Sequence, residues 1–112
     1  MRNPKFQVFS GKGGDHYFRL RAGNGQVVLA SEGYESMAGA LNGIRSVKVN
    51  AADDARYARK EAKDGQFFFT LRAGNNEPIG KSEMYKAKSS REHGIKVIKQ
   101  IAARSPIEDL TF

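Results

Sequence analysis

The sequence predicts an α+β protein of two tandem β-β-β-α repeats. Their strands form one antiparallel sheet with both helices on one face and with pseudo-twofold symmetry. Three observations indicate this fold class. The segment LRAGN occurs at 20–24 and again at 71–75. After each copy, short alternating apolar segments give way to a segment with apolar residues at spacings of three and four. A unit of about 51 residues buries little apolar surface alone, so the two copies are expected to share one core.

The first repeat starts with a short strand at 6–9, followed after a turn by an alternating strand at 17–22. Asn24-Gly25 predicts a tight hairpin turn in which both residues have positive φ, and 26–30 is the returning strand. A helix from about 36 to 50 completes the repeat. Its inward face is predicted to carry Met37, Ala40, Leu41, Ile44 and Val47.

The second repeat follows the same order, with strands at 57–61, 66–73 and 77–81 and a helix from about 87 to 103. Pro78 has no amide hydrogen, which indicates an edge or a bulge in its strand. Pro106 ends the helix. The inward residues of this helix are predicted to be Ile95, Ile98, Ile101 and Ala102.

The whole chain, 1–112, is predicted to be a single domain. It contains repeat 1 at about 5–52, repeat 2 at about 56–104, and a C-terminal tail at 105–112 that is apolar enough for a short strand. Gly43 and Gly94 occupy matched helix positions, although a helix-interior glycine costs roughly 1 kcal/mol relative to alanine. This repetition predicts close packing at both glycines.

The composition favours a small basic protein with anionic partners. The net charge is +7 and the isoelectric point is about 9.9, with the excess spread over both repeats. Nucleic acid, membrane headgroups and acidic proteins are the candidate classes; the alternative is that the charge serves only solubility. There is no cysteine and no apolar run of membrane-spanning or signal length, so we expect a cytoplasmic protein. Membrane-surface binding is not expected, because the second helix has no exposed aromatic wedge and its apolar side is needed for the core.

Two extended motifs, LRAGNGQVVLASEGY…NGI and LRAGNNEPIGKSEMY…HGI, resemble the YegP-like family of bacterial proteins. Members of that family consist of tandem copies of a domain of unknown function. The resemblance covers about 5–103. It implies a β(3)-α-type repeat assembled into a single sheet, and it implies no established activity, so no catalytic residue is carried over. The two copies differ from each other where Gly25 is replaced by Asn76 and Val27 by Pro78.

Residues with catalytic chemistry are present, but their placement argues against an enzyme. His16 and His93 are not equivalent in the two repeats, and no His, Asp and Glu spacing matches a metal site. Asp53-Asp54 lies between the repeats, where an acidic pair is typical of a turn. We therefore expect no catalytic residues, no metal and no cofactor.

A Ser-Glu-x-Tyr motif occurs in both repeats, at 31–34 and 82–85. No base accompanies the serine, so the motif lacks the partner that nucleophilic catalysis requires. The structural interpretation is that Ser or Glu caps the start of the helix and Tyr packs at the corner between helix and sheet.

Alternation along the central strands predicts two opposite sheet faces. Phe18, Leu20 and Ala22, with Phe69, Leu71 and Ala73, are assigned to the core. The helix-free face is expected to carry the candidate binding residues Tyr17, Arg19, Arg21, Phe68 and Arg72. Aromatic and arginine side chains on an open sheet can stack bases and hold phosphates. The same face is alternatively a surface for self-association or a protein partner, or it has no dedicated role and its rings pack on neighbours such as Val27 and Leu29.

The second helix offers a secondary basic patch of Lys88, Arg91 and Lys99, which we interpret as a solvated face. Taken together, these features predict a non-enzymatic binding or protein-interaction module, whose partner the sequence does not identify. The alternative is weak, sequence-tolerant nucleic-acid binding through the aromatic and arginine face.

Overall fold

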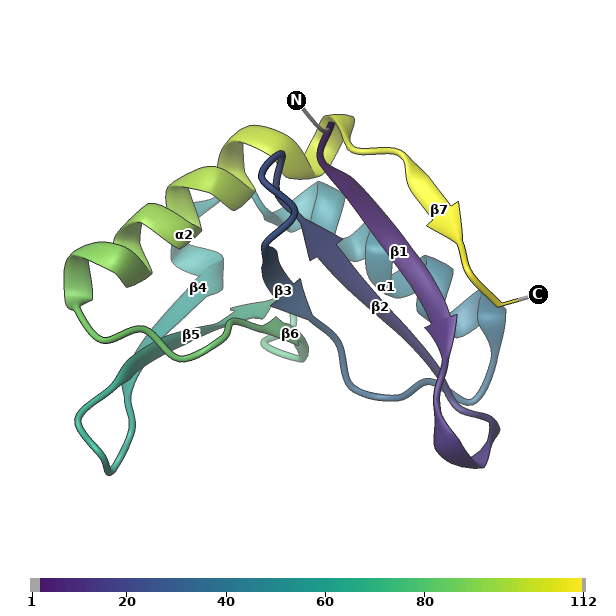
Figure 1. Cartoon of the computed structure of the whole chain (residues 1–112), viewed down its shortest axis with the longest axis horizontal. Helices are drawn as coiled ribbons and strands as arrows, with labels where there is room; N and C mark the ends of the chain where they lie inside the picture. The colour runs from purple at the N-terminus through teal and green to yellow at the C-terminus, as the bar shows by residue number, and fades with distance from the viewer. Residues whose placement is uncertain (1–2, 112) are drawn as a thin grey trace.

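Seven strands and two α-helices follow one another in the order expected for two β-β-β-α repeats (Figure 1). The protein is described here by a computed structural model, which places residues 3–111. The first repeat contains β1 (Lys5–Ser10), β2 (His16–Arg21), β3 (Val27–Ala30) and α1 (Met37–Asn50). The second contains β4 (Tyr57–Glu61), β5 (Phe67–Arg72), β6 (Pro78–Lys81) and α2 (Lys88–Ile101), and β7 (Ile107–Asp109) follows. No helix within these residues is long and apolar enough to cross a membrane.

All seven strands belong to one sheet with the order β4-β5-β6-β3-β2-β1-β7, which confirms the predicted fold class. Six strands pair antiparallel. β7 instead pairs parallel to β1, which makes the sheet mixed. The reason lies in the connection after α2, where the Phe6 N–H donates to the Pro106 carbonyl at 2.8 Å. The chain thus reaches β1 near the start of that strand and runs beside it in the same direction.

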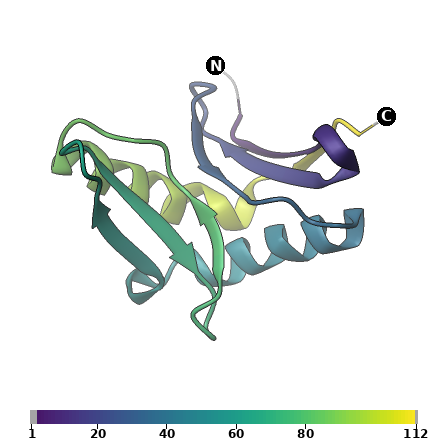
Figure 2. The ribbon, with the colours of Figure 1, turned by 90° about the horizontal axis from the view of Figure 1, so that it is seen from below.

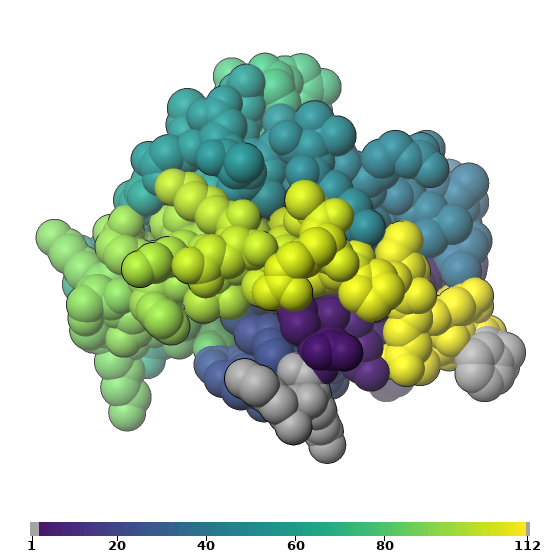
Figure 3. Space-filling view, turned by 90° about the horizontal axis from the view of Figure 1, so that it is seen from above, coloured from purple at the N-terminus to yellow at the C-terminus, as the bar shows by residue number. Residues whose placement is uncertain are grey.

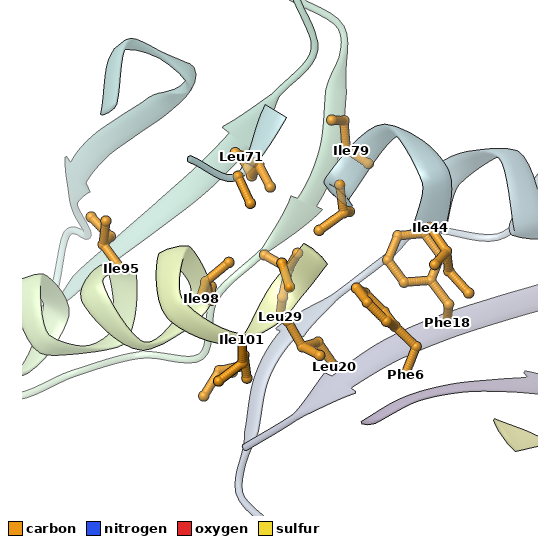
Figure 4. Packing of buried hydrophobic residues seen from close by; sticks show 14 of the residues in the cluster. Phe6, Phe18, Leu20, Leu29, Ile44, Leu71, Ile79, Ile95, Ile98 and Ile101 are labelled. Carbon is orange, nitrogen blue, oxygen red and sulfur yellow. The ribbon is translucent and has the colours of Figure 1, made fainter. Parts of the chain in front are cut away.

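Both helices pack on one face of the sheet. The view from above shows α2 continuing into the C-terminal segment across the middle of the molecule (Figure 3). The predicted inward phenylalanines and leucines of the central strands and the predicted inward residues of α2 are buried, and they form a continuous cluster with those of α1 (Figure 4). Ala22, Ala73, Met37 and Leu41 lie at the edge of this cluster and are partly buried. Apolar periodicity therefore identified the core correctly.

The two repeats meet at a narrow seam between β3 and β6, whose register consists of the pair Ala30 and Lys81. The sheet is strongly twisted there, and the strands of the two repeats form ribbons that point in different directions (Figure 2). In Figure 1, β1 and β2 lie in front of α1, whereas β4 and β5 lie behind α2. The helix-free sides of the two halves consequently face apart.

The hairpins differ from the predicted two-residue turns. The Ala22 N–H donates to the Gln26 carbonyl at 2.9 Å, which closes a loop of three residues, and Gly25 alone in it has positive φ, at 85°. Asn76 occupies the same position in the second repeat with φ of 70°. A three-residue loop that ends in the left-handed region matches the twist of the strands equally well. The strand register shifts by one residue next to each loop. In the second repeat the shift adjoins the pair of Arg72 and Pro78, which agrees with the edge or bulge predicted at this proline.

The serines of the Ser-Glu-x-Tyr motifs bind strand backbone and do not cap the helices. Ser82 Oγ accepts from the Phe69 N–H at 3.0 Å and donates to the Glu83 carbonyl at 2.8 Å, and Ser31 makes the matching bonds in the first repeat. Ser36 caps α1 instead, by accepting from the Gly39 N–H. The motif serines therefore fasten the chain to the sheet where it leaves the third strand of each repeat.

The motif tyrosines pack between helix and sheet, as predicted. Tyr34 stacks with Phe18, and Tyr85 stacks with Phe69. A Cβ atom on Gly43 would lie 2.5 Å from the Tyr34 hydroxyl oxygen, and the equivalent distance for Gly94 and Tyr85 is also 2.5 Å. The matched glycines thus give the tyrosine rings room against the helices.

Candidate anion-binding face of the sheet

The strand register determines which side chains share the helix-free face of the first repeat. Tyr17, Arg19 and Arg21 lie directly opposite Phe9, Gln7 and Lys5 of β1. Because residues opposite each other in a sheet point to the same side, these six residues form one surface, which we call the first-repeat patch.

Gln7 holds the two arginines of this patch together. Its Oε1 atom accepts hydrogen bonds from Arg19 Nε and Arg21 Nε, each at 2.7 Å. Its Nε2 atom donates to Glu108 Oε1 of β7 at 2.7 Å, which fixes the orientation of the amide. Gln7 is only 7% exposed, so the amide is a rigid anchor for both guanidinium groups.

The positive charge of this pair is not neutralised by a direct ion pair. Within residues 3–111, neither Arg19 nor Arg21 has a carboxylate oxygen within 4.0 Å. Burial, together with the neighbouring Arg21, lowers the pKa of Arg19. Glu108 is the nearby acid, and hydrogen bonds from Gln7 and Lys5 hold its pKa below the usual range. Two adjacent guanidinium groups with an amide between them favour the binding of an anion.

The aromatic residues of the patch pack beside Arg19. The rings of Phe9 and Tyr17 stack with centroids 5.7 Å apart, and the Arg19 guanidinium lies 4.5 Å from the Phe9 centroid. The Tyr17 ring also packs against Gly33, where an added Cβ would lie 3.2 Å from Cζ. Phe9 and Gly33 are thus neighbours of the Tyr17 ring. The arrangement orients a planar guanidinium, a group on which bases stack in nucleic-acid complexes.

Phe68 and Arg72 lie apart from this patch, because β3 and β6 separate β5 from β2. They share their surface with Lys60, which pairs with Phe68, and with Lys81, whose ammonium lies 4.8 Å from the Phe68 centroid. We call these four residues the second-repeat patch. The five predicted face residues thus form two groups, because the twist of the sheet turns the halves away from each other (Figure 2).

Each patch adjoins a hollow that contains its matched arginine. Arg21 and Lys5 line a hollow of about 380 Å³, bounded also by Asn3, Pro4 and Pro106. Lys60, Arg72 and Lys81 line a second hollow of about 660 Å³ at the seam between the repeats. Both volumes lie in the range of about 300–1,000 Å³ that is usual for ligand sites.

The secondary basic patch on α2 is largely occupied by internal contacts. Arg91 does not point outward as expected, since it is 9% exposed and donates to Glu92 and to the Lys60 carbonyl. Lys99 pairs with Asp54 at 2.6 Å, and Lys88 lies 5.9 Å from the Phe67 ring centroid. These three residues stabilise the contact of α2 with β4 and β5.

Asp53 and Asp54 have structural partners of the kind expected for a turn. Asp53 accepts from the Ala55 N–H at 3.0 Å. Asp54 pairs with Arg59 and Lys99, and hydrogen bonds from these two lower its pKa to about 2. Among residues 3–111, no group of three or more His, Asp and Glu side chains is placed to hold a metal ion.

Sequence reasoning missed several residues of the two patches. Gln7 and Phe9 alternate along the strand predicted at 6–9, so their common face was available from the pattern, whereas Lys5 lay one residue before that predicted strand. Lys60 and Lys81 required the cross-strand register, and Glu108 required the parallel pairing of β7. Neither the register nor that pairing is encoded in local periodicity.

Comparison with known proteins places this fold in a family. The model of a domain of unknown function, DUF1508, matches residues 12–57 and 62–109. A UPF0339 protein encoded in the ptx operon 5′ region of Stutzerimonas stutzeri is 45% identical over 105 residues, which cover 94% of this chain and 95% of that one. YegP of Shigella flexneri is 43% identical over 102 residues, with 89% and 93% covered.

Two solution structures have the same fold. A UPF0339 protein of Shewanella oneidensis aligns with a TM-score of 0.92 at 39% identity, over 96% of this chain and 92% of that one. YegP of Escherichia coli, titled as a protein of unknown function, aligns with a TM-score of 0.92 at 37% identity, over 99% and 96%. The chain therefore belongs to the YegP-like UPF0339 family, as the sequence motifs predicted, and it carries two matches to DUF1508.

Proposed function

We propose that this protein is a non-enzymatic binding module and that its first-repeat patch binds single-stranded nucleic acid. The observation that carries the proposal is the pair of guanidinium groups held side by side on Gln7, without a direct carboxylate partner in residues 3–111. Arginine forks match phosphate geometry and form strong charge-assisted hydrogen bonds with it.

Free donors and a flat stacking surface support a nucleic-acid ligand. Arg19 uses Nε for Gln7, and its terminal nitrogens make no hydrogen bond within residues 3–111. Its guanidinium carbon lies over the Phe9 ring, and we propose that an unpaired base stacks on the guanidinium while a neighbouring phosphate meets Arg21. The net charge of +7 adds a general attraction for polyanions.

The chemistry of the remaining polar groups supports a role without catalysis. The hydroxyls of Ser31 and Ser82 are engaged with strand backbone, and Asp54 is held by two cations. None of these groups is paired with a base or free to act as one, whereas nucleophilic catalysis requires such a pair.

Fluorescence anisotropy with labelled DNA and RNA, single-stranded and duplex, tests the proposal at two salt concentrations. We expect single strands to bind more tightly than duplexes, and Arg19→Ala/Arg21→Ala to weaken single-strand binding at least about tenfold. The slope of log affinity against log salt should become shallower by about 0.7 for each phosphate that the variant no longer binds.

Lys96→Ala/Arg104→Ala is the matched control, because it removes the same charge from exposed residues on the helical side. This control should retain most of the wild-type affinity. Equal decreases in affinity in both double variants would show that the loss of net charge alone weakens binding, and would contradict the assigned site. Equal binding of duplexes would contradict the single-strand assignment. Absence of all nucleic-acid binding would overturn the proposal and favour a protein partner.

A further inference from the structure

We infer that the second-repeat patch is a separate, weaker site for single-stranded nucleic acid, so that one molecule bridges two strands or two segments of one strand. This inference rests on the function proposed above. Arg72 and Phe68 are the repeat equivalents of Arg21 and Tyr17, and both lie on the helix-free face of β5. The duplication has therefore placed an arginine and an aromatic residue on the same face of one strand in each half.

The second-repeat patch has the charge and the shape of an anion site. Lys60, Arg72 and Lys81 line the hollow of about 660 Å³, and within residues 3–111 none of the three has a carboxylate oxygen within 4.0 Å. The Lys81 ammonium lies beside the Phe68 ring, as Arg19 lies on Phe9. Cations next to an aromatic ring are the combination that binds phosphate and base together.

The two sites are unequal. Glu32 and Glu83 also line the second hollow, and their charge opposes the approach of a phosphate. Gln26 donates to Glu83 across the seam at 2.5 Å, which keeps that carboxylate at the hollow. In addition, Thr70 stands where Arg19 stands in the first repeat, so the second site has no guanidinium pair. The second site is therefore expected to bind more weakly.

The twist of the sheet separates the two sites. Only β3 lies between Arg19 on β2 and Lys81 on β6, and its Ala30 pairs with both of them. The helix-free sides of the two halves nevertheless face apart (Figures 1 and 2). An oligonucleotide short enough to cover only one side leaves the other side free, so two such strands can be bound at once. A longer strand reaches both sites by crossing the seam at Ala30.

Stoichiometry with an oligonucleotide of about six nucleotides, near the small end of the known site sizes, tests this inference. Isothermal titration and native mass spectrometry should give two oligonucleotides per wild-type molecule. Arg19→Ala/Arg21→Ala should leave one weak site, and Arg72→Ala/Lys81→Ala should leave one strong site. Lys96→Ala/Arg104→Ala should still bind two.

Bridging gives a second readout. Energy transfer between a donor-labelled and an acceptor-labelled oligonucleotide should appear with wild-type protein and should fall at least fivefold in each double variant of the patches. A single oligonucleotide per wild-type molecule, abolished by Arg19→Ala/Arg21→Ala and unaffected by Arg72→Ala/Lys81→Ala, would overturn the bridging inference while leaving the proposed function intact. Absence of any oligonucleotide binding would contradict both the bridging inference and the proposed function.

Discussion

The side chain of Leu29 fills the space above Gly80 at the seam between the two repeats. A Cβ atom on Gly80 would lie 2.8 Å from Leu29 Cγ. The two residues are repeat equivalents, and Leu29 belongs to the buried cluster drawn in Figure 4. The close approach shows that the seam has room for one large side chain. The pseudo-symmetry is thus broken where the halves meet, since two leucines would collide there.

Substitutions at this seam are expected to be coupled. Gly80→Ala should lower the free energy of unfolding by about 1–3 kcal/mol through overpacking, and Leu29→Ala by about 2–5 kcal/mol through a cavity. In the double variant the new methyl group enters the space left by leucine, so the decrease should be smaller than the sum by at least about 0.5 kcal/mol. Urea unfolding measures all three. Gly74→Ala is the control, since a Cβ there meets only the Arg56 guanidinium, at 3.7 Å. Strict additivity would contradict the packing relationship.

Gly94→Ala should destabilise the protein although alanine is the better helix former by roughly 1 kcal/mol. The added Cβ would meet the Tyr85 hydroxyl oxygen at 2.5 Å, whereas the next ring atom lies at 3.1 Å. Tyr85→Phe removes the closest atom, so the double variant should unfold at a higher urea concentration than Gly94→Ala alone. The exposed Lys96→Ala on the same helix should change stability by less than about 0.5 kcal/mol. A stabilised Gly94→Ala protein would show that the tyrosine is free to move.

Stability at acid pH should depend on Asp54. Hydrogen bonds from Arg59 and Lys99 lower the folded-state pKa of Asp54 from 3.8 to about 2. A depressed folded-state pKa contributes stability above the unfolded-state value, and this contribution is lost as the pH falls through the folded-state value. The urea midpoint of wild-type protein should therefore fall between about pH 4 and pH 2. Asp54→Asn should have a flatter profile there. Glu35→Gln is the control, because Glu35 is exposed and has no ion pair in residues 3–111, and its stability profile against pH should follow that of wild type. Identical pH profiles for all three proteins would refute the role of Asp54.

Exchange of Gln7 and Glu108 tests the uncompensated arginine pair without changing net charge. In Gln7→Glu/Glu108→Gln, the amide introduced at position 108 can donate to the carboxylate at position 7, so the hydrogen bond between them is retained. The carboxylate now lies against Arg19 and Arg21, compensates one of their two positive charges and occupies the position between them. We expect single-strand affinity to fall about tenfold at unchanged charge, measured by anisotropy, with thermal unfolding as the check on folding. Unchanged affinity in a folded double variant would exclude this pair as the phosphate site.

Local patterns predicted a large part of this structure. The duplicated LRAGN segments, the alternation of Phe18 and Leu20, and the three-four spacing of Ile95 and Ile98 were sufficient for the element order and the core. They succeed because strand and helix periodicities are properties of consecutive residues, and burial of the apolar side follows directly. The matched glycines were also informative, because repetition of a locally unfavourable residue indicates close packing.

The tertiary structure decided the rest. Pairing of β7 beside β1 brings Glu108 to Gln7, and Gln7 to the two arginines, across separations that no sequence spacing specifies. The twist accumulated between β2 and β5 divides one expected face into two patches that point apart. Sequence alternation assigns a side chain to a face of its own strand, whereas register and twist determine which side chains meet and which way that face points.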